Sequence, residues 1–431
     1  MASAINRLPA YAWVIAGTTA VVNGVAWGIP QGTFGVFFSP LADEMGWSRT
    51  ALSSVFSLHL LVNAVLGIFW GWLSDRWSIR GVILISGVLM GVGVFLSSMA
   101  HSLWQLYLFY GFIGGVGLGG TAGPLAALAM RWLRDRPALA VSVGYAGIGA
   151  GTAGLAVLAD RLIAYGGWRF AFQSLAFLVW AAFLVGFILL REFKTSQGRR
   201  GAAHESVAAS EQPHTEPEPE PEPVEHNVPL AGAVTTRAFW TLFGMVVIAT
   251  LGMFLTLVHL VPRAIDLGVP TGAAAILLTM TSLLDIGGKL SGGMLGDRFG
   301  HQRMFALSMF LVCLAMLWLA ISSSLWMLMV FAVAFGLVNG LWTIQFPALA
   351  AQHFGTKHLG AIVGAVLLGA GIGGVTGPVM AGFVFDTTES YRIAFILGAA
   401  IAFAGGLLAI SFPSQPSRRF KPESRPEVKT A

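Results

Sequence analysis

Two charged residues lie inside an apolar stretch of the chain. Asp285 and Lys289 fall within the apolar segment 271–296. A charge at the centre of a bilayer costs at least ~2.5–3.5 kcal/mol on insertion scales, so it is rarely found there without a function. Residues four apart share a helical face and can pair. A buried cation that is partly compensated by an anion is suited to holding an anionic substrate, and the pair therefore predicts the binding site.

The composition of the chain is that of a protein embedded in lipid. Of its 431 residues, 56% are hydrophobic and 10% are charged, whereas soluble domains carry about 25% charged residues. Apolar runs of roughly 20 residues recur, each long enough to cross a hydrocarbon core. We expect a polytopic all-α membrane protein. A single cysteine excludes an intrachain disulfide and a cysteine-rich metal site.

Apolar runs separated by helix breakers predict twelve transmembrane helices in two sets of six. We expect an N-terminal bundle (1–190) and a C-terminal bundle (238–412). The predicted spans are 11–39, 50–73, 80–100, 103–131, 137–164, 168–190, 238–262, 271–296, 303–321, 324–350, 357–385 and 391–412.

The segment between the bundles has a different composition. Residues 191–237 are polar and contain an alternating Glu/Pro run at 216–223. Such a segment buries too little apolar surface to fold, which predicts a disordered linker. The polar tail 413–431 is expected to be loose as well. Of the 25 Lys and Arg residues, 19 fall on the side of the termini, so both termini, the linker and the tail are expected to be cytoplasmic.

The two halves repeat one motif at the same place. Gly-Trp-Leu-Ser-Asp-Arg (71–76) closes the second span, and Gly-Met-Leu-Gly-Asp-Arg (293–298) closes the eighth. Repeats in the same order predict two halves related by an axis along the membrane normal, with a substrate site between them near the midplane. The charged residues of the motifs could latch the halves together or form a static cluster that sets topology. They are Asp75, Arg76, Arg80, Asp297, Arg298 and Arg303.

At these motifs the chain resembles the major facilitator superfamily, whose signature is a G-x-L-x-D-R-x-x-x-x-[RK] cytoplasmic loop. Finer features resemble its bacterial branch related to monocarboxylate transporters and oxalate/formate antiporters. They are residues 35–49, His259-Leu-Val-Pro262 with Asp266 and Gly268, and 369–378. The resemblance covers the chain except the linker and tails. It favours the latch, closed in the outward-open state, and a bacterial inner membrane as the location.

The resemblance also implies a role for Lys289. In monocarboxylate transporters the eighth helix carries Asp-x-x-x-Arg, whose arginine binds the substrate carboxylate, and this chain has Asp285-Ile-Gly-Gly-Lys289 there. An ammonium group is a point charge and cannot make the bidentate contact of an arginine. The alternative is a lysine that snorkels to the interface. Lys289 lies about 12 Å along the helix from Asp297, at ~1.5 Å per residue, which is deep for snorkelling.

Three further residues bear on proton coupling. Asp285 could carry the proton, because an anion that draws Lys289 away would favour its protonation, or it could be a fixed counter-ion. Gln31 follows Pro30 where animal monocarboxylate transporters place a lysine; it can hydrogen-bond a substrate but cannot titrate, which leaves exchange open. His259 titrates near neutral pH when unperturbed, or it is a gate or packing residue at the outer mouth.

The remaining candidates for the pocket wall are Asn339 and Trp342 in the tenth span and Tyr110 in the fourth. Aromatic residues in membrane spans otherwise face lipid or the core. No residues suggest a nucleophile–base pair, an ATP site or a metal site, so neither an enzyme nor a cofactor is expected.

The function expected is a monomeric secondary transporter of small organic anions, in particular a proton-coupled monocarboxylate transporter that works by alternating access. An organic-anion exchanger of the oxalate/formate type is the alternative. An exporter of hydrophobic or cationic compounds would need a buried acid without a buried base, which Lys289 argues against. A transporter-fold sensor would need a signalling domain, and the linker and tails are too short and too polar to supply one.

Overall fold

The computed structural model describes residues 10–132, 137–191, 228–355 and 359–413 of the chain. The regular secondary structure in these ranges consists of helices, which confirms the predicted all-α membrane protein. Within the same ranges, eleven helices are long and apolar enough to cross a membrane. One of them covers 47 residues, about 70 Å at ~1.5 Å per residue, which is more than twice the thickness of a hydrocarbon core.

This long helix contains two of the predicted spans. It lies within α9 (Pro137–Leu189), where Gly167 has the non-helical angles φ 77° and ψ 173°. Glycine has no Cβ and adopts a positive φ without strain, so the chain can reverse direction at this residue. The segments on either side correspond to the predicted spans 137–164 and 168–190. The described part of the chain therefore has the twelve spans that the sequence predicts.

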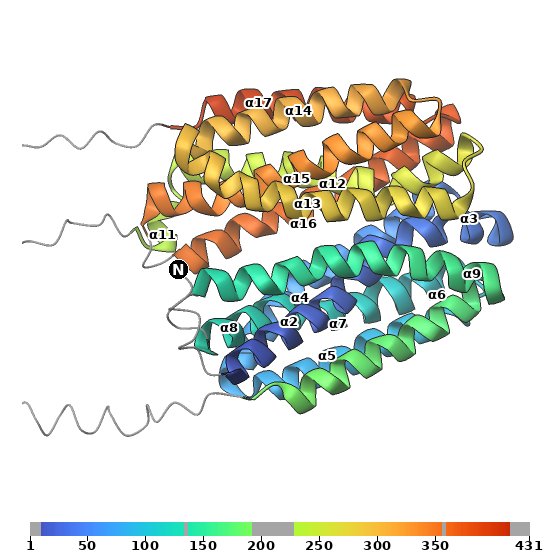
Figure 1. Cartoon of the computed structure of the whole chain (residues 1–431), viewed down its shortest axis with the longest axis horizontal. Coiled ribbons are helices and arrows are strands. Elements are labelled where there is room, and N and C mark those ends of the chain that lie inside the picture. Colours follow the sequence, from blue (N-terminus) through green and yellow to red (C-terminus); the bar gives the residue numbers. More distant parts are fainter. Residues whose placement is uncertain (1–9, 133–136, 192–227, 356–358, 414–431) are drawn as a thin grey trace, which may run out of the picture.

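The helices form two groups that follow the order of the sequence (Figure 1). Residues 10–190, here called the N-terminal half, lie in the lower part of the view. They form α2 (Ala10–Gly28), η1 (Ile29–Thr33), α3 (Phe34–Met45), α4 (Arg49–Arg76), α5 (Ile79–Ser97), α6 (Leu103–Leu106), η2 (Tyr107–Gly114), α7 (Gly115–Gly119), α8 (Ala122–Trp132) and α9.

Residues 237–412, here called the C-terminal half, lie in the upper part of the same view (Figure 1). They form α12 (Arg237–Asp266), α13 (Thr271–Phe299), α14 (His301–Ile321), α15 (Leu325–Phe354), α16 (Leu359–Thr388) and α17 (Arg392–Ile410). The two halves meet where α4 packs on α16, α9 on α13, and α3 on α12.

The long helices run between two ends of the molecule (Figure 1). The side on the left of the view, where α2 begins and α17 ends, is called the terminal end. The opposite side, the distal end, carries the turn at Gly167 and the loops that follow α3 and α12. Positions along the helices are described below relative to these two ends.

The first span changes its helical form in the middle. Between α2 and α3 lies the π-helical turn η1, which contains Pro30 and Gln31. Proline has no N–H to donate and its ring disturbs the preceding turn, and a wider turn accommodates both effects. Such turns occur often at functional sites because they redirect the side chains that follow. The fourth span contains a similar turn, η2, around Tyr110.

Two glycines allow α13 and α15 to approach backbone to backbone. A Cβ added at Gly288 would clash with the carbonyl oxygen of Leu337, and one at Gly340 would clash with that of Asp285. Small residues at a helix interface permit such contacts inside membranes. The approach fixes the relative height and rotation of the two helices at the level of the predicted charged pair.

The predicted linker 191–237 is described only in part. Residues 192–227, which include the Glu/Pro run, lie outside the described residues, as does the tail from 414 onward. Residues 228–236 are ordered at the terminal end. The backbone N–H of Val228 donates to the carbonyl of Phe354 at 2.9 Å, and the short helix α11 (Leu230–Ala233) follows. This last part of the linker is apolar enough to pack, with Ala233 fully buried.

Candidate functional site

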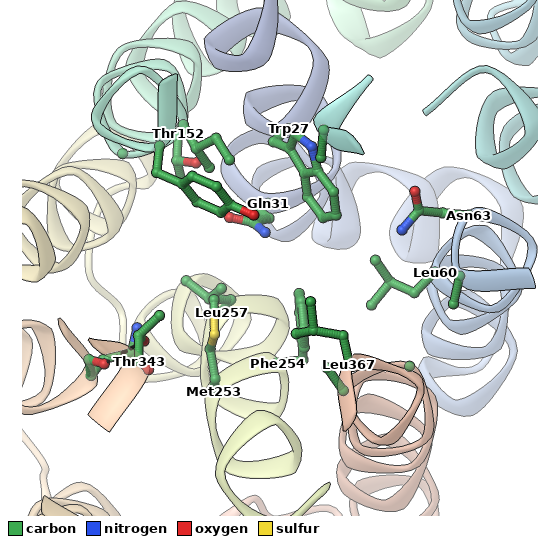
Figure 2. A pocket seen from close by; sticks show the side chains of 18 of the residues that line it. Trp27, Gln31, Leu60, Asn63, Thr152, Met253, Phe254, Leu257, Thr343 and Leu367 are labelled. Carbon is green, nitrogen blue, oxygen red and sulfur yellow. Dashed lines mark hydrogen bonds between the residues drawn. The ribbon is translucent and has the colours of Figure 1, made fainter. Parts of the chain in front are cut away.

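A cavity of about 490 Å³ lies between the two halves. The turn η1 and helices α2, α4, α7, α8 and α9 line it on one side, and α12, α13, α15 and α16 line it on the other. Among the described residues of its wall, Asp285 and Lys289 are the charged ones. Leu60, Phe254 and Leu367 point into the space from three helices (Figure 2). The space between two parallel repeats is where a transporter of this architecture holds its substrate.

The two charges form an ion pair at the cavity wall. Lys289 Nζ lies 2.6 Å from Asp285 Oδ2. Asn339 Nδ2 donates to the other carboxylate oxygen at 2.8 Å, and Trp342 Nε1 donates to Asn339 Oδ1 at 3.0 Å. The side chain of Lys289 is 22% exposed and that of Asp285 is 11% exposed. An ammonium has three N–H donors and the contact with Asp285 uses one, so the lysine is the group available to an anion.

The local helix geometry explains why these four side chains converge. Asp285 and Lys289 are one turn apart on α13, and Asn339 and Trp342 are nearly one turn apart on α15. Because Gly340 brings α15 against the backbone of α13 at Asp285, the short Asn339 side chain reaches the carboxylate directly. The site is therefore built from two neighbouring helices of one half.

The facing wall comes from the N-terminal half and carries no charge among its described residues. Gln31 in η1 and Asn63 in α4 turn their side-chain amides toward the cavity (Figure 2). The six-membered ring of Trp27 projects into the space between them (Figure 2). Thr152 of α9 lines the same wall. A ligand in the cavity would thus meet an ion pair on one side and neutral polar or apolar groups on the other.

The distal end is closed by a network that joins the two halves. The Arg49 guanidinium, at the start of α4, contacts both carboxylate oxygens of Asp266, at 2.7 and 2.8 Å. Arg49 Nη1 also donates to the Tyr391 hydroxyl at 2.7 Å. The Asp386 carboxylate of α16 accepts from the backbone N–H groups of Arg49 and Thr50, at 3.0 and 2.8 Å. An anion at a helix N-terminus is favourable because the first N–H groups lack helical partners.

His259 lies within this network and not at the cavity wall. Its Nε2 is 2.9 Å from the Pro378 carbonyl oxygen, and its Nδ1 is 2.9 Å from the Tyr391 hydroxyl. A carbonyl oxygen can only accept, so in the neutral ring Nε2 carries the hydrogen and Nδ1 accepts from Tyr391. A directed chain of hydrogen bonds thus runs from Arg49 through Tyr391 and His259 to Pro378. The imidazole of His259 is fully buried.

The cavity extends from the middle of the helices toward the terminal end. On α4 the wall residues run from Leu60 to Ile68, and on α16 they run from Gly364 to Gly371. The distal parts of the same two helices are packed together instead, with Ser57 Oγ donating to the Val375 carbonyl at 2.8 Å. The structure is therefore closed distally.

The structure brings five of the predicted site residues to the cavity: Gln31, Asp285, Lys289, Asn339 and Trp342. It does not bring Tyr110 there. That ring is fully buried, with its centroid 5.2 Å from that of Phe34 and 6.1 Å from that of Phe172.

The charged residues of the repeated motifs belong to the terminal end. The contacts described for them stay within one half. These contacts are the Asp297–His301 pair at 3.3 Å, a hydrogen bond from Arg80 Nη2 to the Phe187 carbonyl at 2.8 Å, and the guanidinium groups of Arg76 and Arg298 over the rings of Trp72 and Phe299. Arg303 lines a second, smaller cavity of about 320 Å³. The side chain of Asp75 lies outside the described part.

Sequence reasoning assigned no role to Arg49, Tyr391 or Asp386. A signal was present, because Arg49 and Asp266 are opposite charges at the predicted outer ends of the second and seventh spans, one in each half. Partners of this kind across two repeats are candidates for contacts that change as the halves move.

Known proteins share the sequence and the fold of this chain. The profile of the Major Facilitator Superfamily matches residues 17–270 and 242–430. Monocarboxylate transporter 3 of Rattus norvegicus is 30% identical over 410 residues, which cover 93% of this chain and 80% of that protein. Monocarboxylate transporter 11 of Homo sapiens is 26% identical over 421 residues, which cover 94% and 83%.

A solved structure supports the same assignment at the level of the fold. It is the crystal structure of a bacterial homolog to the human lysosomal transporter Spinster, in an inward-facing and occupied conformation. It aligns with a TM-score of 0.69 over 93% of this chain and 95% of that chain, at 14% identity. The superfamily profile covers nearly the whole chain. The chain belongs to the Major Facilitator Superfamily and is a membrane transporter, not an enzyme, related to the monocarboxylate transporters.

Proposed function

We propose that the protein is a secondary active transporter of small organic anions, specifically of monocarboxylates. The observation that carries this proposal is the ammonium group of Lys289, which lies at the wall of a cavity shared by both halves, with Asp285 as its one described ion-pair partner. A cation held at this depth attracts an anion because water around it is limited. A single carboxylate matches a single ammonium.

Binding would proceed by exchange of partners at Lys289. In the empty site the ammonium is compensated by Asp285 Oδ2 at 2.6 Å. A substrate carboxylate offers two acceptor oxygens and competes for the same N–H donors. Asn339 remains bonded to Asp285 Oδ1, so the aspartate keeps its position while the lysine turns toward the substrate.

We propose that the same exchange couples the anion to a proton. When Lys289 turns away, Asp285 Oδ2 loses its cation in a site of low polarity, and this favours the protonated carboxyl. Substrate and proton then occupy the site together, and the loaded cavity gains no net charge. The arrangement suits symport, since neutral loading lowers the cost of crossing.

Transport would follow alternating access. We propose a bacterial inner membrane as the location, and the positive-inside distribution of Lys and Arg supports an orientation with both termini, and so the terminal end, on the cytoplasmic side. With that orientation, a structure closed distally and hollowed toward the terminal end is inward-facing. The opposite state requires the Arg49–Asp266 contact to break, and the charged motif residues at the terminal end would then latch across the halves. We propose a monomer as the working unit, because one chain supplies both walls of the cavity.

Uptake by Lys289 variants in proteoliposomes tests the proposal. Lys289→Met removes the charge, keeps a long side chain, and should abolish uptake of labelled monocarboxylates. Lys289→Arg should retain binding, because its guanidinium can grip a carboxylate at two points. Arg392→Met, which removes a charge from the distal end of α17, is the matched control and should transport normally. Undiminished uptake by Lys289→Met would show that Lys289 does not bind the substrate, and it would overturn the proposal.

One observation favours organic-anion exchange as the second candidate. Gln31 stands in η1, at the position where the resemblance to animal monocarboxylate transporters implies a lysine, and an amide cannot carry a proton. An exchanger needs no proton site, and Asp285 would then be a permanent counter-ion. Wild-type proteoliposomes distinguish the two: a symporter accumulates substrate on an inward proton gradient, whereas an exchanger requires internal substrate and ignores the gradient.

A further inference from the structure

Two amide side chains at the cavity wall have no hydrogen-bond partner among the described residues. Gln31 and Asn63 point into the space between the halves (Figure 2). Each amide carries two N–H donors and an acceptor oxygen. Polar groups that line a cavity without protein partners bind water or a polar group of a ligand.

The surface around these amides is apolar. It is formed by Trp27 and Leu60 of the N-terminal half and by Phe254, Leu257 and Leu367 of the C-terminal half. Apolar surface removed from water contributes roughly 25 cal/mol per Å². An acid of one to three carbons would touch little of this surface once its carboxylate is on Lys289. A larger apolar body would cover it, and cavities of this volume, about 490 Å³, are in the range that holds drug-sized ligands.

The charge of the cavity limits the ligand to one carboxylate. Lys289 is the cationic residue among the described residues of the wall, and it is already paired with Asp285. A second carboxylate would move from water into the cavity, where no second cation among the described residues compensates its charge. Such a transfer is costly in a site of low polarity. The amides of Gln31 and Asn63 can hydrogen-bond a carboxylate but cannot compensate its charge, whereas an uncharged oxygen needs only the hydrogen bonds.

We infer that the substrate is a monocarboxylic acid with an apolar body of at least ring size and an uncharged hydrogen-bonding group remote from the carboxylate. Lys289 holds the carboxylate, the apolar walls enclose the body, and Gln31 and Asn63 select the remote group. The inference rests on the proposed function, because it takes Lys289 as the carboxylate site. It goes further by naming the chemical class of the acid and the residues that set specificity.

Calorimetric titration of the full-length purified protein with a matched series tests this class. The probes are propanoate, 3-phenylpropanoate, its 3- and 4-hydroxyphenyl derivatives, 3-(4-carboxyphenyl)propanoate and 3-phenylpropan-1-ol. The phenyl ring should tighten binding at least about tenfold over propanoate. Whichever of the 3- and 4-hydroxyl groups lies closer to the amides should tighten binding about two- to tenfold further. Adding a second carboxylate, as in 3-(4-carboxyphenyl)propanoate, should weaken binding at least about tenfold relative to 3-phenylpropanoate. Replacing the single carboxylate with a hydroxyl, as in 3-phenylpropan-1-ol, should weaken it by at least about as much.

Variants of the two amides test their role separately. Gln31→Met and Asn63→Leu keep the size of each side chain and remove its polar atoms. Each should reduce the gain from the hydroxyl and leave the gain from the phenyl ring intact. Gln173→Met is the matched control, because Gln173 bonds to Ser98 at 3.4 Å and lies outside the cavity wall. That variant should bind the whole series as the wild type does.

The outcomes separate failure of the inference from failure of the function. If propanoate binds as tightly as the phenyl acid, and Lys289→Met abolishes binding of both, the inference is overturned while carboxylate transport stands. An unchanged hydroxyl gain in both amide variants overturns the role of Gln31 and Asn63. If 3-phenylpropan-1-ol binds as tightly as the acid, and Lys289→Met binds both, the proposed function itself fails.

Discussion

Arg49 and Asp266 form a two-point ion pair that joins the N-terminal half to the C-terminal half. Their nitrogen and oxygen atoms lie 2.7 and 2.8 Å apart, and the two side chains are 18% and 26% exposed. Arg49 begins α4 and Asp266 ends α12, so the pair ties together the distal ends of helices from both halves. In the proposed alternating access, the distal end opens only after this contact is lost.

Replacing Arg49 with Ala should shift the molecule toward a state that is open distally. Losing charge-assisted hydrogen bonds of this kind costs about 1.5–3 kcal/mol. This corresponds to roughly a ten- to hundredfold change in the ratio of the distally open to the distally closed state. The measurement uses a chain with Cys313→Ala and Ser53→Cys, since Ser53 lies beneath the network and contacts His259 at 3.2 Å. A membrane-impermeant maleimide added from the distal side should label Arg49→Ala at least about tenfold faster.

An ion pair within one half provides the control for this experiment. Glu44 pairs with Arg169, also at the distal end, but both residues belong to the N-terminal half. Glu44→Gln should therefore leave the labelling rate unchanged. The charge-reversed double variant Arg49→Asp/Asp266→Arg should slow labelling again. Equal rates for Arg49→Ala and the parent chain would show that this pair does not hold the distal end closed.

Replacing Tyr391 with Phe should weaken the same closure by a smaller amount. The hydroxyl accepts from Arg49 at 2.7 Å and is 2.9 Å from His259 Nδ1, so its loss breaks the hydrogen-bond chain in the middle. We expect the closed state to lose about 0.5–1.5 kcal/mol relative to the distally open state, as measured by the same labelling assay. Its effect should not add to that of Arg49→Ala, because the two residues share one contact. Tyr107→Phe, which loses a hydrogen bond to Ala51 inside the N-terminal half, should have no effect on labelling.

Asp285→Asn should separate substrate exchange from proton-driven accumulation. The amide cannot take up a proton but can still accept a hydrogen bond from Lys289 through its oxygen. Proteoliposomes of this variant should exchange internal for external substrate at a substantial rate and fail to accumulate it on an inward proton gradient. If the variant still accumulates substrate, Asp285 is a counter-ion and the coupling proton binds elsewhere, with His259 the next residue to test.

Gly340→Ala should disturb both stability and binding. Its Cβ would meet the backbone carbonyl of Asp285, so α15 must move away and Asn339 must lose its contact with the carboxylate. Overpacking of this kind costs about 1–3 kcal/mol, which thermal unfolding in detergent would register. Gly293→Ala on α13 is the control, because a Cβ there meets nothing within 4 Å. Equal melting temperatures and affinities for the two variants would contradict the close approach of α13 and α15.

The sequence made Asp285 and Lys289 visible because a charge inside an apolar run is costly and therefore rare. Helix number alone was a weaker guide to the wall of the cavity. It placed Asn339 and Tyr110 equally, yet only Asn339 reaches the cavity. The difference lies in rotation about the helix axis, which Gly340 fixes for α15 and the π-helical turn η2 alters around Tyr110. Apolar periodicity predicts neither the rotation of α15 nor the effect of η2 on the direction of Tyr110.

The twelve spans were predictable because their lengths follow from the thickness of the membrane. The sequence does not distinguish the tight reversal at Gly167 from an ordinary loop, since glycine is frequent in this chain and many of the described glycines lie against another helix. The sequence shows opposite charges at Arg49 and Asp266, but it does not show that they pair with each other. Pairing across halves depends on how the two repeats dock, and apolar periodicity does not specify this.

The ion-pair site belongs entirely to one half, since Asp285, Lys289, Asn339 and Trp342 all lie on α13 and α15. If the halves rock as the proposed alternating access requires, these four groups move together with the C-terminal half, and a bound anion keeps the same partners. The opposite wall then moves relative to the anion. Changes in α13 and α15 should consequently alter how tightly the anion is held in every state. Changes in the N-terminal wall, including those at Gln31 and Asn63, should alter affinity only in the states in which that wall faces the bound anion.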